Sequence, residues 1–233
     1  MRIVPLYTKV FVSNLLRYVF VPHNHKRGYF IVIDGGEGSG KSTIVERLKA
    51  EFPEIEFSRE PGGTPYAEEI RKVMLNSQHA KDASGATILL LVSAGRSDHM
   101  DHRAAPAILS GKHFMTDRSD CTSWGYQIGG QEGGYALKKL FFAIRPVVYK
   151  KVQPDLYVIL EVDPAEGARR VAERRGEINH FDERKQDFHM RVMQAYRTFG
   201  LLFPFRVKFV DANRTKDEVY ADVRAILLKK LKK

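Results

Sequence analysis

Short apolar runs alternate along the chain with longer stretches in which apolar residues recur at helical spacing. The runs are rich in β-branched and aromatic residues and predict strands at 29–33, 56–58, 113–116, 156–162 and 207–210. Helical spacing appears first at Ile44, Val45, Leu48 and Phe52, and again over 65–76, 83–109, 134–151, 164–175, 182–200 and 215–231. Strands that alternate with helices form a parallel sheet covered on both faces. The pattern predicts one three-layer α/β domain with a central parallel sheet of about five strands.

The first 28 residues are apolar and basic and stand apart from this pattern. We expect a basic apolar N-terminal extension over 1–28 and a folded domain over 29–233. The extension has the character of a transit peptide or of a helix lying on a surface, although its β-branched residues suit a strand equally well. A structural or disposable role, organelle targeting and membrane-surface contact all stay open. No apolar run reaches the roughly 18 residues that a membrane span requires.

The net charge of +10 is confined to the two ends of the chain. Residues 1–33 hold five Lys/Arg and no acid, residues 224–233 hold five more and no acid, and the remainder is formally neutral. A nucleic-acid-binding face across the body of the protein is therefore poorly supported, and we expect no nucleic-acid partner. The single cysteine, Cys121, excludes an internal disulfide framework, so we expect a reducing compartment, the cytoplasm, unless residues 1–28 direct the chain to an organelle.

A glycine-rich segment follows the first predicted strand and precedes a predicted helix. It satisfies the phosphate-loop pattern G-x-x-x-x-G-K-S/T and comprises Gly35, Gly36, Glu37, Gly38, Ser39, Gly40, Lys41 and Ser42, with Thr43 next. Glycines let successive backbone N–H groups turn toward a phosphate, and the helix N-terminus adds positive potential. Lys41 is expected to reach the β- and γ-phosphates of ATP, and the Ser42 hydroxyl to ligate Mg²⁺. The segment predicts a P-loop NTPase fold.

Further segments occur in a fixed order after this loop. They are REPGGT at 59–64, Ile70-Arg71, LLLVSAGR at 89–96, DRSDCTSWGYQ at 117–127, PDL leading to VDP at 154–164, and FH with RV at 188–192. Together they cover about residues 29–212, and in type and order they resemble the bacterial-type thymidylate kinase family. The resemblance implies ATP-dependent phosphorylation of dTMP to dTDP with Mg²⁺, and a homodimer packed through helices such as 83–109 and 134–151.

The resemblance also assigns the charged residues of the site. Transfer between two nucleotides gathers negative charge, so converging arginines and Mg²⁺ make chemical sense. By resemblance Arg59, Arg71 and Arg118 hold the acceptor phosphate or steer the transferred group, and Asp117 organises Mg²⁺ and its water. A carboxylate at Glu37 would normally repel a phosphate; in the family the corresponding acid accepts the 3′-hydroxyl of the deoxyribose.

The acceptor base has its own set of expected contacts. By resemblance Arg96 contacts the thymine carbonyl, Thr122 and Ser123 bond the base, and Tyr126 with Gln127 shapes the sugar and base pocket. The family usually has a phenylalanine that stacks on thymine where this chain has Val92. Ser119, Gly95 and the pair Asn179-His180 depart from the family pattern as well.

A lid is expected after the fourth strand, where Arg169, Arg170, Arg174 and Arg175 crowd one helix end. Because Ser39 stands where some family members carry an arginine, a lid arginine is needed to neutralise transition-state charge, and Arg174 and Arg175 are the best candidates. Two alternatives stay open: a P-loop kinase for another nucleoside monophosphate or for a deoxynucleoside, and a non-catalytic nucleotide-binding protein.

Overall fold

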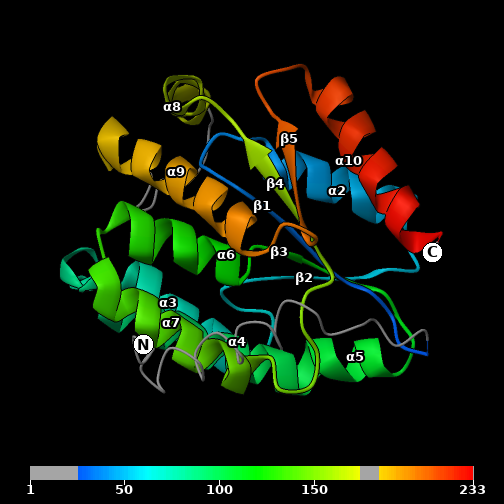
Figure 1. Ribbon diagram of the computed structural model, residues 1–233, viewed down its shortest axis with the longest axis horizontal. Helices are drawn as coiled ribbons and strands as arrows, with labels where there is room; N and C mark the ends of the chain where they lie inside the picture. The colour runs from blue at the N-terminus through cyan, green and yellow to red at the C-terminus, as the bar shows by residue number, and fades with distance from the viewer. Residues whose placement is uncertain (1–25, 174–183, 233) are drawn as a thin grey trace, which may run out of the picture.

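Five parallel strands form a single sheet in the order β2-β3-β1-β4-β5 in the computed structural model of the chain, which describes residues 26–173 and 184–232 (Figure 1). The strands are β1 (Phe30–Gly35), β2 (Glu56–Arg59), β3 (Phe114–Asp117), β4 (Leu156–Glu161) and β5 (Val207–Asp211). All four pairings are parallel, so the carboxyl ends of the strands share one edge of the sheet. The predicted five-stranded α/β fold is confirmed.

Helices cover both faces of this sheet. They are α2 (Lys41–Glu51), α3 (Pro65–Asn76), α4 (Gly85–His99), α5 (Ala105–Leu109), α6 (Asp120–Ser123), α7 (Gly134–Val148), α8 (Pro164–Glu173), α9 (Gln186–Leu202) and α10 (Lys216–Leu231), with a short 3₁₀ turn at Ala80–Asp82. Two π-helical segments, η2 (Met100–Ala104) and η3 (Trp124–Gly130), continue α4 and α6. Each of the predicted helical ranges contains helix.

The side chains on the two faces of the central strands belong to two separate hydrophobic cores. On one face, Ile31 and Ile33 pack with Leu48 of α2 and Val223 of α10. On the other, Phe30 and Val32 pack with the larger group of helices that includes α4, α7 and α9. Figure 1 shows α2 and α10 together on one side of the sheet and α4, α7 and α9 on the other. Burial on both faces explains why β1 is an unbroken apolar run up to Asp34.

One predicted helix proved to be three elements, and one helical segment was not predicted. The range 83–109 is divided among α4, η2 and α5. Residues 120–130 form α6 and η3, although their glycines weaken the helical pattern. Gly125 has a packing reason: a Cβ there would lie 3.2 Å from the ring of Tyr196 on α9. Small residues in η3 thus let α9 approach the end of β1.

The start of the described chain is tied to the amino edge of the sheet. Arg27 forms a bidentate pair with Asp155, at 2.8 Å for each bond, and the Gly28 N–H donates to the carbonyl of Ile108. Residues 1–25, which make up most of the expected extension 1–28, lie outside the described residues. Among the helices of the described ranges, none combines the length and apolar character needed to cross a bilayer.

Candidate active site

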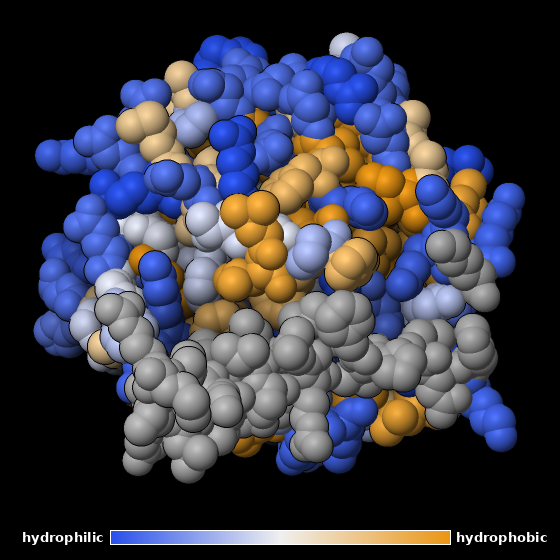
Figure 2. All heavy atoms as spheres, viewed as in Figure 1, coloured by the Kyte–Doolittle hydropathy of each residue, from blue (hydrophilic) through white to orange (hydrophobic). Residues whose placement is uncertain are grey.

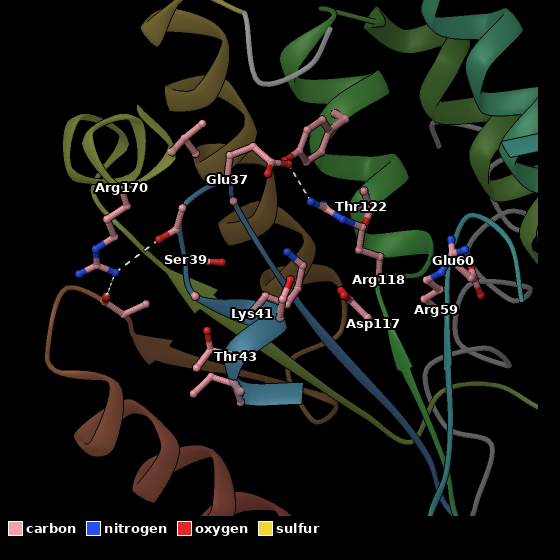
Figure 3. A pocket seen from close by; sticks show the side chains of 18 of the residues that line it. Glu37, Ser39, Lys41, Thr43, Arg59, Glu60, Asp117, Arg118, Thr122 and Arg170 are labelled. Carbon is pink, nitrogen blue, oxygen red and sulfur yellow. Dashed lines mark hydrogen bonds and ion pairs between the residues drawn. The ribbon is translucent and has the colours of Figure 1, made fainter. Parts of the chain in front are cut away.

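A cavity of about 890 Å³ opens at the carboxyl edge of the sheet. Its floor is the loop between β1 and α2, and its walls come from the loop after β2, from α3 and α4, from the segment after β3, from α8 and from the β5–α10 loop. Figure 3 shows the labelled side chains of the β1–α2 loop and of the β3 end converging on one space. Parallel α/β sheets bind ligands at this edge.

The phosphate loop has the backbone geometry that its glycines predict. Gly38 and Gly40 adopt left-handed φ angles of 72° and 79°. A Cβ on Gly38 would lie 2.2 Å from the carbonyl oxygen of Gly167 on α8, so the loop and α8 are in backbone contact. Only glycine satisfies both the angle and the contact at position 38. The loop leads directly into the N-terminus of α2, where free N–H groups favour an anion.

The loop side chains predicted to bind the nucleotide all line the cavity. They are Ser39, Lys41, Ser42 and Thr43, beside the glycines 36, 38 and 40; Gly35 closes β1 immediately before them. Lys41 is only 7% exposed and points into the cavity in Figure 3. The Ser39 Oγ is buried and has no hydrogen-bond partner among the described residues. This arrangement presents a cation and backbone donors to a phosphate chain.

Glu37, in the phosphate loop, lines the cavity and is held by two partners from the segment after β3. The Arg118 Nη2 and the Tyr126 hydroxyl each donate to its Oε1 at 2.7 Å. Burial alone would raise the pKa of Glu37, but the charges of Arg118 and Lys41, with these hydrogen bonds, lower it from 4.5 to about 2. Glu37 is therefore ionised at neutral pH, and Arg118 compensates its charge.

Arg118 itself adopts a strained backbone conformation. Its φ of 69° lies in the left-handed region, which a residue with a Cβ rarely occupies. Its N–H donates to the Ile33 carbonyl at 2.9 Å, and its carbonyl accepts from the Thr116 hydroxyl at 3.2 Å. These bonds fix the turn after β3 so that the guanidinium reaches back over β1. Strain of this kind is commonly retained where a side chain must be aimed.

A buried carboxylate that the sequence analysis did not select, Asp34, organises this corner. It is fully buried at the end of β1, and it accepts hydrogen bonds from Cys121 Sγ at 2.9 Å, Thr122 Oγ1 at 2.5 Å and the Tyr196 hydroxyl at 2.9 Å. The Arg118 Nη1 lies 3.7 Å from its Oδ1. Asp34 thus joins β1, α6, α9 and the site arginine. The signal in the sequence was a single acid at the end of an apolar strand.

Two further arginines share one carbonyl at the mouth of the cavity. Arg59 Nη1 and Arg71 Nη1 donate to the carbonyl oxygen of Pro61 at 3.1 and 3.0 Å. Burial first, and then the charges of Arg59 and Arg118, lower the pKa of Arg71, with Glu68 and Asp117 opposing them. The three predicted phosphate-binding arginines therefore lie close enough to repel one another. An anion placed between them relieves that repulsion.

Asp117 ends β3 beside the phosphate loop, and its Oδ1 is buried without a hydrogen-bond partner among the described residues. The Ser42 hydroxyl lines the same cavity. Within those residues no group of three or more His, Cys, Asp or Glu forms a metal cluster. Mg²⁺ fits this donor set, since it takes one or two protein oxygens and completes its shell with phosphate and water.

The remaining wall of the cavity suits a flat, partly polar ring. Thr122, Ser123, Tyr126 and Gln127 line it as predicted, and Val92 lies beside them. Met74 and Leu75 of α3, which the sequence analysis did not select, add an apolar surface. The Tyr126 ring is fixed edge-to-face against Phe188, 5.9 Å between centroids. The wall thus combines hydroxyl and amide groups with apolar contacts, without a stacking ring at position 92.

Arg96 lies behind this wall rather than among the residues that line the cavity. It is 4% exposed, its Nε donates to Glu60 at 2.5 Å and its Nη2 donates to the Ser123 hydroxyl at 3.1 Å. Glu60, a lining residue that the sequence analysis did not select, also accepts from Ser119 at 3.3 Å. Burial raises the pKa of Glu60, but Arg96 and His99 outweigh this and lower it. In this arrangement Arg96 orients Ser123, and its contact with a base stays a prediction.

On the opposite side, α8 carries two of the four lid arginines. Arg170 Nη1 donates to the Ala212 carbonyl at 2.8 Å and to the Gly38 carbonyl at 3.4 Å, so it bridges the phosphate loop and the end of β5 (Figure 3). Arg169 pairs with Glu166 and Glu173. The predicted lid residues Arg174 and Arg175 lie outside the described residues.

Comparison with known proteins gives one family. The family described as Thymidylate kinase matches residues 33–223. A thymidylate kinase of Hahella chejuensis is 34% identical over 210 residues, covering 88% of this chain and 99% of the relative. The thymidylate kinase of Magnetococcus marinus is 35% identical, covering 84% of this chain and 94% of the relative. That of Clostridium novyi is 36% identical, covering 86% of this chain and 98% of the relative. The match spans the phosphate loop, the arginine cluster and the segment after β3.

Proposed function

This chain belongs to the thymidylate kinase family and phosphorylates dTMP to dTDP at the expense of ATP, and we propose that it does so in the cavity at the carboxyl edge of the sheet. One observation carries the assignment of the site. Glu37, inside the phosphate loop, is bonded to Arg118 and Tyr126 from the segment expected to hold the acceptor. The donor loop and the acceptor pocket therefore meet at one carboxylate.

In the proposed mechanism the two nucleotides lie on either side of Lys41. The backbone amides of residues 36–43 hold the donor phosphates, while Arg59, Arg71 and Arg118 hold the phosphate of dTMP. A phosphate oxygen of dTMP attacks the γ-phosphorus in line, the bond from that phosphorus to the β–γ bridging oxygen breaks, and ADP leaves with the bond electrons. Lys41 and the arginines stabilise the charge that spreads over the transferred group, so catalysis is mainly positioning and electrostatics.

Ser42 and Asp117 are the proposed Mg²⁺ residues. The orphaned Asp117 Oδ1 and the Ser42 hydroxyl supply oxygen donors next to the phosphate loop. Bound there, Mg²⁺ would neutralise charge on the donor phosphates. Glu37 is proposed to accept the 3′-hydroxyl of the deoxyribose, since its low pKa keeps it an acceptor at neutral pH.

Closure over the donor is assigned to the arginines at and after the end of α8. We keep Arg174 and Arg175 as the proposed charge-neutralising residues. Arg170 is a further candidate, because its guanidinium already contacts the phosphate-loop carbonyl of Gly38. Arg214, Thr215 and Lys216 line the cavity beyond α8, and this end is the proposed location of the adenosine.

The decisive experiment is ADP release from ATP-Mg²⁺ against a panel of dTMP, dUMP, dCMP, UMP and dGMP, supplied at equal concentration. The expected result is fastest turnover with dTMP and none with the Lys41→Ala variant, which removes the phosphate-binding cation. The panel is needed because of Val92, which is 6% exposed in the cavity wall proposed to hold the base. A valine cannot stack on the base as an aromatic ring would. Faster turnover of another monophosphate would reassign the acceptor, and ATP binding without transfer would favour the non-catalytic alternative.

Two features of the protein's setting are also proposed. Leu90 of α4 and Tyr135 of α7 are 51% and 77% exposed, and they support a homodimer packed through these helices. Sedimentation of the wild-type chain and of Leu90→Glu tests the homodimer, with the variant expected as a monomer.

The lone, buried Cys121 supports a reducing, cytoplasmic setting for the kinase domain proposed over 29–233.

A further inference from the structure

A group of polar side chains lies behind the loop that joins β2 to α3. Its centre is His99 at the end of α4, which is completely buried. The His99 Nε2 lies 2.8 Å from the Ser58 Oγ on β2, and the His99 Nδ1 lies 3.5 Å from the Glu60 Oε1 in the loop. The ring also packs on Phe114 of β3, 5.7 Å between centroids. Among the described residues that line the cavity, Glu60 alone belongs to this group, so His99 supports the cavity wall from behind.

The hydrogen bonds of this group run in one direction. Glu60 is ionised and can only accept, so the tautomer of His99 that suits it carries its proton on Nδ1. The Nε2 then accepts from the Ser58 hydroxyl, whose oxygen accepts from the Arg103 Nη1 at 3.2 Å. We call Ser58, Glu60, His99 and Arg103 the support network. It runs without interruption from η2 to the end of β2.

Arg103 also holds the two ends of the loop by their backbone. Its Nη2 donates to the Phe57 carbonyl at 2.9 Å, and its Nη1 donates to the Gly63 carbonyl at 3.1 Å. A planar guanidinium can reach both carbonyls at once, which an ammonium group cannot. The π-helical turn of η2 carries Arg103 on the same side as His99, four residues earlier.

The loop lies directly on the support network. A Cβ on Gly63 would be 2.6 Å from the Ser58 Oγ and 2.7 Å from the His99 Cδ2, at a left-handed φ of 91°. Only glycine permits this approach. A change in the position of the His99 ring is therefore transmitted to the loop.

The loop needs support because the groups it carries repel one another. Arg59 and Arg71 share the Pro61 carbonyl, and their charges with that of Arg118 oppose one another until an anion binds. This repulsion favours an opened loop. The strand that leads into the loop resists little, since β2 has four residues and is an outer strand paired only with β3.

We propose that His99 and Arg103 are positioning residues for the acceptor phosphate. They hold the loop between β2 and α3 closed, so that Arg59 and Arg71 are in place before the nucleotide binds. The inference deepens the proposed function and rests on it, because it takes this loop as part of the acceptor site. Holding the arginines in advance spares the nucleotide the cost of ordering them.

The proposal separates the two substrates. If loss of the support network leaves about a tenth of the molecules with a closed loop, the KM for dTMP rises about tenfold. The phosphate loop is held by other contacts, those of Glu37 with Arg118 and those of Gly38 with α8, so the KM for ATP should not change. Once dTMP is bound the loop is closed in every variant, so kcat should change little.

Steady-state kinetics of His99→Leu and Arg103→Met tests this expectation. Both variants should raise the KM for dTMP about tenfold, with kcat and the KM for ATP within about twofold of the wild type. Arg103→Lys keeps the charge but cannot reach both carbonyls, so it should behave like Arg103→Met. A wild-type KM for dTMP in Arg103→Lys would mean that charge alone suffices and would overturn the proposal.

Arg206→Met is the matched control at the far side of the sheet. The Arg206 Nη1 donates to the Pro154 carbonyl at 2.8 Å and to Gln153 at 3.3 Å, so this arginine also holds backbone. It lies in the turn from α9 to β5, where Figure 2 shows an apolar region near the middle of the view, and β5 and β2 are opposite outer strands. Arg206→Met should lower the midpoint of urea unfolding as Arg103→Met does, but leave the KM for dTMP unchanged. An equal rise in KM in both variants would reduce the effect to lost stability and overturn the proposal.

Hydrogen exchange in the free chain tests the support network without any substrate. The Glu60 N–H donates to the Asp117 carbonyl and the Gly63 N–H to Glu68. Both amides should exchange about tenfold faster in His99→Leu and in Arg103→Met, while amides of the phosphate loop should not change.

The two measurements can fail separately from the proposed function. Unchanged exchange of the Glu60 and Gly63 amides would overturn the proposal whatever the acceptor is. Faster exchange with an unchanged KM for dTMP would make the support network purely structural, and would overturn it as well. Absence of dTMP turnover by the wild type would instead reject the proposed function, while the exchange of the loop amides still reports on the support network.

Discussion

The guanidinium of Arg118 and the carboxylate of Glu37 lie 2.7 Å apart although 81 residues separate them in the chain. The pair joins the phosphate loop to the segment after β3, and Tyr126 shares the same carboxylate oxygen. Its formation depends on the left-handed backbone at Arg118, which turns the side chain back over β1. In the proposed mechanism the pair marks where the donor half of the site ends and the acceptor half begins.

Replacing Glu37 by glutamine should therefore impair use of dTMP more than use of ATP. The amide keeps the size of the side chain but removes the charge that Arg118 and Tyr126 bond. Loss of charge-assisted hydrogen bonds, about 1.5–3 kcal/mol, predicts a fall in kcat/KM for dTMP of roughly 10- to 100-fold. Steady-state kinetics with each substrate varied in turn measures this. Glu46→Gln on the exposed face of α2 is the control, and an equal loss in both variants would argue against a site role.

The same carboxylate predicts a pH dependence of stability. The folded pKa of Glu37, about 2, lies below its ordinary 4.5, so its ionisation stabilises the fold above pH 4.5 and this contribution is lost as the pH falls toward 2. At neutral pH the difference in unfolding free energy between wild type and Glu37→Gln should be at most about 3 kcal/mol, and it should shrink on acidification. Urea unfolding at about pH 6 and about pH 3 checks the sign. A difference that grows at low pH would contradict it.

Asp34 is predicted to act through its neighbours rather than on substrate. Asp34→Asn removes the negative charge to which Thr122, Tyr196 and Arg118 are bonded or paired. The two site residues among them, Thr122 and Arg118, therefore lose the group that holds them in place. We expect kcat to fall at least tenfold, with KM for dTMP raised, and the unfolding free energy to fall by about 1–3 kcal/mol. Tyr196→Phe removes one donor and should be milder in both readouts. If Asp34→Asn lowered only stability, and the folded fraction turned over dTMP normally, Asp34 would be purely structural.

Asp117→Asn should change the metal requirement of the reaction. An amide oxygen is a poorer Mg²⁺ partner than a carboxylate, so the half-saturating Mg²⁺ concentration should rise about tenfold or more. Titration of ADP release with Mg²⁺ measures this, and chelation should abolish wild-type turnover. Asp101→Asn, whose carboxylate pairs with Lys150 and Lys151 at the surface, is the control. An unchanged Mg²⁺ titration in Asp117→Asn would remove Asp117 from the metal site.

The strand positions, the helices and the phosphate loop were predictable because each has a local signal. β1 is apolar on both faces, and the glycines at 38 and 40 occupy the left-handed angles that their motif requires. For Asp34 the local signal was only a single acid at the end of an apolar strand, and it did not reveal the role: the partner Tyr196 is 162 residues away, and only the packed fold brings the two together. The helical segment 120–130 was not predicted because its glycines have a low helix propensity. They are there because they allow close packing against α9.

Arg96 shows a different limit. Its position within the resembling segment predicts a contact with the acceptor base, which stays a prediction; in the structure its guanidinium is bonded to Glu60 and Ser123 behind the cavity wall. Motif position identifies which residues gather near a site. It does not distinguish a side chain that reaches the ligand from one that orients a neighbour, because that depends on which acceptor lies closer in the fold.

Gly38→Ala offers the sharpest test of the contact between the phosphate loop and α8. The substitution places a Cβ 2.2 Å from the Gly167 carbonyl oxygen at a φ of 72°, so the loop or α8 must move. Gly111 also has a left-handed φ, 94°, but a Cβ there meets nothing within 4 Å. Both alanine variants should lose about 1–2 kcal/mol from backbone strain, whereas only Gly38→Ala should raise KM for ATP, by about tenfold or more.

Gly167→Ala approaches the same contact from the other side, since its Cβ would lie 2.5 Å from the Glu37 carbonyl oxygen. Gly167 is helical and carries no strain of its own, so this variant isolates the clash. If the close backbone contact shapes the donor site, Gly167→Ala raises KM for ATP as Gly38→Ala does while Gly111→Ala leaves it unchanged. A normal KM for ATP in both clash variants would mean that α8 moves aside at no cost, and that the loop holds its shape without α8.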